Sequence, residues 1–300
     1  MAKASGWGSE DRGFKSRRPD IVPPKLFGEG GHFFMIKRKH SLLSKKIDIV
    51  FLILSPIFAT VTSLILKTDY FVSTLLFFGI PAGYLSWRNS HAIKKSFIFA
   101  LIMGIVGSFV GDFFAVSSFS WIVPTTIFSL RLFGLVPVED LVWGFLLVYD
   151  IIMLYEHFLD KGRHNLKDTN LKYFIVAATF LLIVAFLIYF LNRRYLNIRY
   201  FYVCAGLIFV LLPIVSFLSF FPRLISKFIK AGTYFFYQGL MFELVGLSLN
   251  YWRFNGKDYI GWITISLFKL QFPLEEFVFW MVLFSTCVLS YYEFFDDDQK

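Results

Sequence analysis

The sequence predicts an all-α membrane protein with about eight transmembrane helices in two tandem parallel repeats. Three observations predict this class. Hydrophobic residues make up 57% of the 300 residues and charged residues only 17%, whereas soluble domains are about half apolar and about a quarter charged. The apolar residues are gathered into runs of about 20, the length at which a helix crosses a bilayer. The pattern of a proline, any one residue and then two adjacent acidic residues occurs twice.

This composition excludes a soluble globular enzyme, a secreted disulfide scaffold and a disordered regulator. Two cysteines, Cys204 and Cys287, are too few for a disulfide framework or a zinc site. The net charge is +9, but the basic residues lie mostly near the N-terminus and between apolar runs, as membrane-flanking charge does. We therefore expect no nucleic-acid partner. The glycines of residues 28–31 lack the dinucleotide-binding spacing, and we expect neither a cofactor nor a bound metal.

Eight apolar segments are expected to cross the membrane. In chain order they are residues 47–66, 70–87, 96–117, 140–159, 173–191, 200–221, 228–249 and 275–295. With the N-terminus in the cytoplasm, the cytoplasmic loops contain roughly twice as many lysines and arginines as the opposite loops. The bias predicts a multi-pass protein of the cell membrane with both termini in the cytoplasm.

The spans divide the chain into five parts. Glycine, proline and basic residues dominate the first 36 residues, which contain no apolar core of signal-peptide length. The predicted parts are a disordered basic cytoplasmic arm (1–46), a first membrane repeat (47–160), a cytoplasmic linker (161–172), a second membrane repeat (173–295) and an acidic tail (296–300).

The two membrane regions resemble each other at a spacing of 131–136 residues. The matching features, in order, are Pro81 with Pro213, Asp112 with Glu243, Trp121 with Trp252, residues 136–143 (VPVEDLVW) with 272–279 (FPLEEFVF), and Tyr155 with Tyr291. Three spans separate the fourth from the eighth, so the halves are expected to be parallel repeats. This arrangement suits two similar sites, or one site lined from both halves.

The repeated acidic motif has two interpretations. A proline at the first helical position has no N–H to lose, and carboxylates in the first turn meet the positive helix end, so the acids could simply cap two helices. Alternatively, two neighbouring carboxyls close to hydrocarbon cannot both ionise cheaply. One then stays protonated beside an anionic partner, as general acid catalysis requires. The residues concerned are Glu139, Asp140, Glu275 and Glu276.

Three further acids lie inside predicted spans. Asp112 and Glu243 come late in the third and seventh spans, where an ionisable group is costly and indicates function by default. A polar lock between helices explains them as well. Asp150 lies within the fourth span, and Thr286 stands at the matching position of the second half, which favours a structural or auxiliary role.

Aromatic residues near the acids are candidates for substrate binding. Aromatic faces stabilise a carbocation as they do an ammonium ion, although tryptophan and tyrosine also form belts at membrane interfaces. The candidates are Trp121, Trp143, Trp252, Trp280 and Phe279.

These residues resemble the integral-membrane lycopene cyclases, the flavin-free type found as small paired subunits in bacteria and as fused repeats in archaea and fungi. The resemblance rests on residues 272–280 (FPLEEFVFW), on the weaker copy around Pro137, and on residues 251–261, which look like the family's tryptophan-containing lead-in. It covers most of residues 70–295.

The resemblance implies a paired-repeat helical bundle that cyclises the ends of lycopene or a related carotenoid without redox change. An acid protonates the terminal double bond, the cation closes a six-membered ring, and a base removes a proton. By position, Glu275 and Glu276 match the family's acidic pair. Glu139 and Asp140 match it in the first copy, where Asp140 replaces the more usual glutamate. Asp112 and Glu243 are then supporting or proton-abstracting candidates.

Two other functions fit the same residues. One is a proton-coupled membrane transporter or lipid-handling protein. The other is a non-catalytic subunit of a cyclase complex that keeps the acids as helix caps. The expected partners are the lipid bilayer and a carotenoid or other isoprenoid substrate, and a homo-oligomer or contact with carotenoid-pathway enzymes stays open.

Overall fold

The computed structural model describes residues 30–160, 171–266 and 269–295 and is mostly helical, at 76%. The helices are α1 (Gly30–Leu66), α2 (Tyr70–Thr74), η1 (Leu75–Gly79), α3 (Ile80–Arg88), η2 (Ser90–Ala92), α4 (Ile93–Ala100), η3 (Leu101–Val106), α5 (Gly107–Ser117), α6 (Val138–Phe158), α7 (Leu171–Leu191), η4 (Arg193–Leu196), α8 (Phe201–Ala205), η5 (Gly206–Leu211), α9 (Leu212–Phe220), η6 (Pro222–Leu224), α10 (Ile225–Ser248), η7 (Glu276–Val282) and α11 (Phe284–Phe295). The strands are β1 (Arg131–Leu132), β2 (Val136–Pro137), β3 (Trp262–Ile265) and β4 (Leu270–Pro273).

Within the described residues, five helical stretches are long and apolar enough to cross a membrane, so the chain has the character of a helical membrane protein. They are Lys45–Leu66, Tyr70–Arg88, Ser90–Ser117, Lys172–Leu191 and Phe201–Phe220. The bent pair η7 and α11, which meet at 47°, counts as a sixth if it is one span. The two remaining predicted segments form α6 and α10, which are of spanning length but are not among the five. The predicted number of eight spans is therefore not confirmed.

Parts of the predicted domain layout lie outside the described residues. These are residues 1–29 of the arm, 161–170 of the linker and 296–300 of the tail. Residues 30–46 of the predicted arm belong to α1. The described residues fall into two compact units, divided between Asp48 and Ile49.

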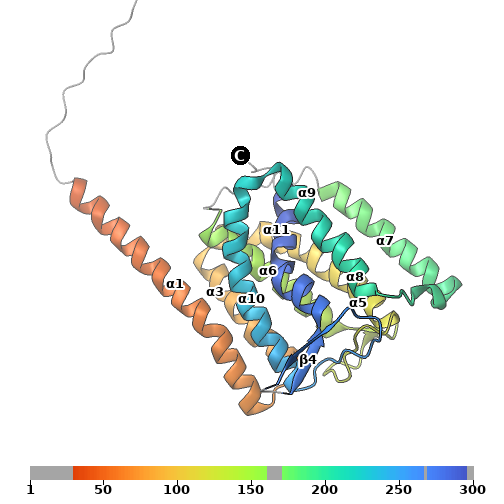
Figure 1. Cartoon of the computed structure of the whole chain (residues 1–300). Coiled ribbons are helices and arrows are strands. Elements are labelled where there is room, and N and C mark those ends of the chain that lie inside the picture. Colours follow the sequence, from red (N-terminus) through yellow and green to blue (C-terminus); the bar gives the residue numbers. More distant parts are fainter. Residues whose placement is uncertain (1–29, 161–170, 267–268, 296–300) are drawn as a thin grey trace, which may run out of the picture. The chain divides into compact units, whose positions relative to one another are not determined.

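Helices α6 and α11 lie in the middle of the bundle, between α10 and α3 on one side and α8 and α9 on the other, whereas α7 lies at its edge (Figure 1). Most of α6 is buried, and only 6% of the apolar window of α7 is. The backbone of η3 meets α6 directly, because a Cβ on Gly104 would lie only 2.7 Å from the carbonyl oxygen of Gly144. This close approach lets α6 sit deep among its neighbours.

Each acidic motif follows a short antiparallel hairpin. Strand β1 pairs with β2, and β3 pairs with β4. The motif prolines, Pro137 and Pro273, are the last residues of β2 and β4, and helix follows each of them directly. Pro137 is thus the extended N-cap of α6, with φ −63° and ψ 149°, rather than its first helical residue as predicted. The difference arises because this proline is still paired in the hairpin.

The two loops that lead to the hairpins are joined across the molecule. Ile122 and Arg253 exchange both backbone hydrogen bonds, at 3.0 and 2.9 Å. The tyrosine hydroxyl of Tyr259 also donates to the carbonyl oxygen of Ser120. These contacts hold the two acidic motifs at the same end of the bundle (Figure 1).

Candidate acid site

The first acid pair lies in the first turn of α6, and both carboxyls are fully buried. Glu139 accepts a hydrogen bond from the backbone N–H of Phe128 at 2.8 Å. The carboxyl of Asp140 faces the phenol of Tyr70 and the carboxyl of Asp112, which α5 supplies. Within the described residues, neither oxygen of Asp140 meets hydrogen-bond geometry. The structure therefore brings the predicted residues Glu139, Asp140 and Asp112 together.

The second acid pair begins the helical segment after Pro273. Glu275 accepts a hydrogen bond from the backbone N–H of Ile260 at 2.5 Å. Glu276 faces the phenol of Tyr202 and the carboxyl of Glu243, which α10 supplies. The indole Nε1 of Trp252 donates to Glu243 at 3.1 Å. The surroundings of this pair therefore match those of the first: a backbone N–H from the preceding loop, a tyrosine and a third acid.

The glutamates do not cap their own helices. One oxygen of Glu139 and one of Glu275 bind N–H groups in the preceding loops, and the other oxygen of each has no partner among the residues described. A helix cap instead binds the first-turn N–H groups of its own helix. The hydrogen bonds of Glu139 and Glu275 therefore differ from those that the capping interpretation predicts.

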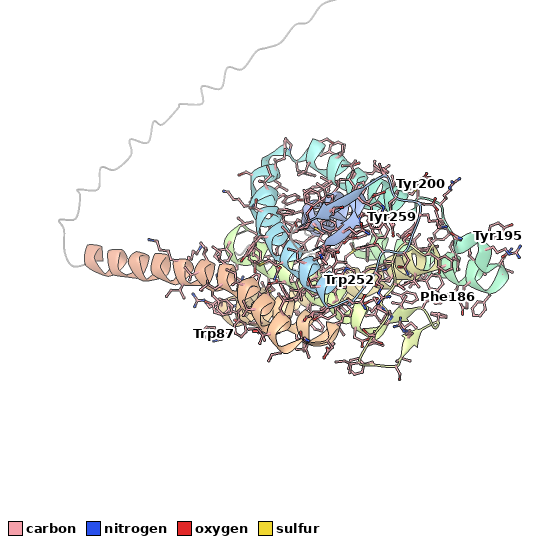
Figure 2. All side chains as sticks on the ribbon, turned by 60° about the horizontal axis from the view of Figure 1, so that its bottom comes forward. Trp87, Phe186, Tyr195, Tyr200, Trp252 and Tyr259 are labelled. Carbon is pink, nitrogen blue, oxygen red and sulfur yellow. The ribbon has the colours of Figure 1, made fainter. Side chains whose placement is uncertain are left out.

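Aromatic rings line the region between the two acid pairs. The rings of Trp121 and Trp252 lie 6.3 Å apart, and Tyr70 contacts Trp252 edge-on at 5.7 Å. Trp280 lies 6.2 Å from Tyr202. Figure 2 shows Trp252 and Tyr259 near the middle of the view from the loop end, in contrast to Trp87 and Tyr195 at its edges.

Three indole N–H groups near the acids are buried and lack a hydrogen-bond partner in the described part of the chain. They belong to Trp121, Trp143 and Trp280. Buried polar groups are nearly always hydrogen-bonded, and these three donors share that lack of a partner with buried polar atoms elsewhere in the bundle, such as those of Ser96 and Ser285.

The two acid pairs belong to one continuous region. Asp112 acts electrostatically on Tyr70 beside the first pair and on Tyr202 beside the second. Tyr259 bridges the two lead-in loops, and burial together with the nearby Glu276 and Glu275 raises the pKa of its phenol above the ordinary value. The phenol therefore stays protonated and can keep donating to the Ser120 carbonyl.

Two residues singled out from the sequence lie elsewhere. The ring of Phe279 packs on Gly206, where a Cβ would lie 2.2 Å away, and belongs to an apolar core with Val210. It serves helix packing rather than the acid site. Asp150 is buried along α6, where Gln238 donates to it at 3.1 Å and to the Phe77 carbonyl at 2.7 Å.

Sequence reasoning missed Tyr70, Tyr202 and Arg131. The two tyrosines are 132 residues apart, within the repeat spacing, so the repeat contained a signal for them. Arg131 has no basic counterpart at the repeat spacing. Its electrostatic effect on Asp140 depends on the hairpin that positions it.

No group of three or more histidine, cysteine, aspartate or glutamate side chains within residues 30–160, 171–266 and 269–295 is arranged to hold a metal ion. No family model, curated protein or solved structure matches this chain. The geometry consists of one buried acid pair and a second pair in which Glu275 is buried and Glu276 half-buried, each beside a phenol, and such carboxyls can exchange protons with a bound molecule.

Proposed function

We propose that this chain is a carotenoid cyclase of the integral-membrane lycopene cyclase type, acting in the cell membrane. The observation that carries the proposal is the pair of acid sites, in which Glu139, Asp140 and Glu275 are buried and Glu276 is half-buried. They combine carboxyl oxygens that lack a partner among the described residues with tryptophan and tyrosine rings. An acid in a dry, aromatic setting is suited to protonate a polyene and to stabilise the cation that forms. The resemblance of residues 272–280 to this family points to the same chemistry.

In the proposed reaction, a carboxylic acid of the site gives its proton to a terminal double bond. The resulting cation closes a six-membered ring, and a carboxylate removes a neighbouring proton to leave a ring double bond. One proton enters and one leaves, so the product is an isomer of the substrate and the step requires no redox partner. Tryptophan faces stabilise the positive charge between the two proton transfers.

We also propose that the chain is a tandem duplication with eight spans and both termini in the cytoplasm. Several structural correspondences support the duplication. Phe119 and Asn250 both have positive φ, of 55° and 62°, and Phe133 and Lys269 both have φ 54°. Positive φ is uncommon in residues other than glycine, so its occurrence at repeat spacing favours a common backbone plan. In this topology both acid pairs lie toward the non-cytoplasmic face.

The direct test is pigment analysis after expression of the intact chain in a host that accumulates lycopene. We expect ringed carotenoids with the wild-type protein. Glu276→Gln and Glu275→Gln should each lower ring formation by about 10²-fold or more, because general acid catalysis contributes that much. The matched control is Asp258→Asn, an exposed acid of the same lead-in loop that pairs with Arg199.

No rings from a verified amount of wild-type protein would refute the cyclase proposal. Full activity in both glutamate variants would remove the assigned roles. Equal losses in Asp258→Asn would mean that the loop, rather than the acid pair, is responsible.

Proton-coupled transport is the second candidate, and Asp150 favours it. This acid is buried along a helix of spanning length, and one of its oxygens has no partner among the residues that the structure describes. Intramembrane acids of this kind occur in proton relays. Reconstitution in liposomes separates the two functions, because a transporter gives proton-dependent flux and leaves carotenoids unchanged.

A further inference from the structure

The segment that leads to the second acid pair, residues 251–260, is joined by hydrogen bonds to the first half of the chain, residues 49–160. These bonds lie at its start, near its middle and at its end. Tyrosine hydroxyls make the first and last contacts, and backbone groups make the middle one. In chain order they join Tyr251 to Thr68 and Ser73, Arg253 to Ile122, and Tyr259 to Ser120. The first half of the chain therefore holds this segment at both ends.

The last of these contacts lies beside a hydrogen bond of the acid pair. Ile260 directly follows Tyr259, and its backbone N–H donates to the Glu275 carboxyl at 2.5 Å. Tyr259 is half-buried, and its ring meets those of Tyr202 and Trp262 edge-on, at 6.0 and 5.1 Å. Because both the hydroxyl and the ring of Tyr259 are held, the next peptide group has little freedom to move. The contacts of Tyr259 thus fix the position of the N–H that binds the carboxyl.

The first acid pair has the same kind of donor with a different support. The backbone N–H of Phe128 donates to Glu139 at 2.8 Å, and Phe128 lies 132 residues before the matching donor of the second pair. The ring of Phe128 meets that of Phe71 edge-on at 5.4 Å. Ile127, at the position that matches Tyr259, is exposed. The first half therefore supports its own donor, whereas the donor of the second half depends on the first half.

We propose that Tyr259 is a positioning residue of the second acid pair: its bond to the Ser120 carbonyl keeps the Ile260 N–H on Glu275, so that the first half of the chain sets the geometry of the second site. For ring formation, this inference rests on the proposed cyclase function. A Glu275 carboxyl without this N–H is free to turn away from the substrate, so proton transfer slows while substrate binding stays the same.

Amide hydrogen exchange of the full chain in lipid nanodiscs, resolved to single residues by mass spectrometry, tests the positioning. Tyr259→Phe keeps the ring and loses the hydroxyl. We expect the Ile260 amide to exchange about 2- to 10-fold faster in this variant, the effect of one hydrogen bond. The Phe128 amide should be unchanged, which checks that the fold is intact. The matched control is Tyr195→Phe, an exposed tyrosine at the edge of the molecule (Figure 2), which should leave both amides as in the wild type.

A double variant shows whether Tyr259 acts through the hydrogen bond to Glu275. Glu275→Ala removes the acceptor, so the Ile260 amide should exchange faster in that variant as well. Adding Tyr259→Phe to Glu275→Ala should then bring no further increase. Independent increases from the two substitutions would overturn the inference, and so would an Ile260 amide that Tyr259→Phe alone leaves unchanged.

Ring formation is then measured with the same tyrosine variants. Tyr259→Phe should lower kcat by about 2- to 10-fold and leave KM unchanged, because it displaces a carboxyl rather than the substrate. Tyr195→Phe should match the wild type. A higher KM at constant kcat would mean that Tyr259 binds the substrate itself, which contradicts a positioning role.

The exchange experiment needs no substrate, so it separates this inference from the proposed function. If the wild-type protein forms no rings but the Ile260 amide responds as expected, the cyclase is refuted and the positioning of Glu275 by Tyr259 stands. If rings form but the amide does not respond, the positioning is refuted and the cyclase stands.

Discussion

At the scale of single residues, the absence of a Cβ at Gly246 permits the hydrogen bond between Trp252 and Glu243, beside the second acid pair. The indole of Trp252 lies directly on Gly246, where a Cβ would be 2.2 Å from the ring. This position brings its Nε1 to Glu243. In the first half Ala115 stands at the matching position, 131 residues earlier, and the Trp121 Nε1 has no partner among the described residues. The two sites thus differ in how firmly a tryptophan is tied to an acid.

Gly246→Ala should therefore displace the Trp252 indole and destabilise the protein by about 1–3 kcal/mol, the usual cost of overpacking. The matched control is Gly239→Ala in the same helix, where nothing lies within 4 Å of an added Cβ. That variant should gain about 0.5–1 kcal/mol, because alanine is the better helix former. Thermal unfolding in detergent, followed by tryptophan fluorescence, measures both. Equal effects of the two substitutions would contradict the assigned packing.

Among the site residues, the acids are conspicuous in the sequence, whereas the tyrosines are marked only by their repeat spacing. Asp112 and Glu243 are conspicuous because charge is rare inside apolar runs. Tyr70 and Tyr202 are two of 15 tyrosines in a chain with 21% aromatic residues. Their repeat spacing is a weak signal among so many aromatic residues, and the folded backbone is what places them beside the acids.

At the scale of elements, α6 and α11 exchange side-chain hydrogen bonds far from the acid pairs. The Tyr155 hydroxyl donates to Glu293, and the Tyr292 hydroxyl donates to Glu156. Each helix thus contributes a tyrosine and a glutamate at consecutive positions. The reciprocal pattern fixes the two central helices against each other.

These contacts correct one detail of the sequence match. The first glutamates of the two motifs, Glu139 and Glu275, are 136 residues apart, and the same spacing pairs Tyr155 with Tyr291. The reciprocal contact instead pairs Tyr155 with Tyr292, which is 137 residues away. The π-helical turn η7 explains the extra residue, because such a turn inserts one residue into a helix. The sequence contains no strong signal for this insertion.

A buried ion pair between α4 and α6, which shares Glu156 with these contacts, should be costly to break. Lys95 and Glu156 lie 3.2 Å apart, and their side chains are 5% and 0% exposed. Lys95→Met should destabilise the protein by about 3–5 kcal/mol, because it removes a buried charge from its partner. The double variant with Glu156→Gln should recover part of the loss. The measurement is unfolding in detergent for each single and double variant.

The control for these single and double variants is the exposed ion pair of Arg199 and Asp258, whose side chains are 79% and 43% exposed. Arg199→Met should change stability by only about 0–1 kcal/mol. A loss in Lys95→Met as small as in Arg199→Met would mean that the buried pair contributes little.

At the scale of the whole molecule, the outer helices were predicted more securely than the central ones. Helix α7 is apolar on all sides and mostly exposed, so its composition alone identifies it as a candidate span. Helices α6 and α10 are shielded by their neighbours and include polar residues such as Asp150 and Gln238. A helix that faces protein instead of lipid need not be apolar throughout, so hydropathy marks it less clearly.

The whole molecule places its acids on the central elements and its apolar surface outside. The apolar core that includes Tyr70, Phe242 and Trp252 contains rings of the acid site, and the peripheral helices present leucine, isoleucine, valine and phenylalanine outward. Three of the four motif carboxyls, Glu139, Asp140 and Glu275, are therefore sheltered from water, which is the setting that the proposed proton transfer to a carbon–carbon double bond requires.

Ring formation in heavy water tests the central claim most directly. Purified protein in lipid is equilibrated in D₂O and then given a lycopene substrate. The mass of the product is measured by mass spectrometry. If a carboxyl of the acid site starts the reaction, its exchangeable deuteron enters the product while a substrate proton leaves. The account predicts a product heavier than its substrate by a single mass unit for each ring formed, and unchanged in mass in ordinary water. A ringed product without deuterium, or with a mass that reveals oxidation or reduction, would contradict it.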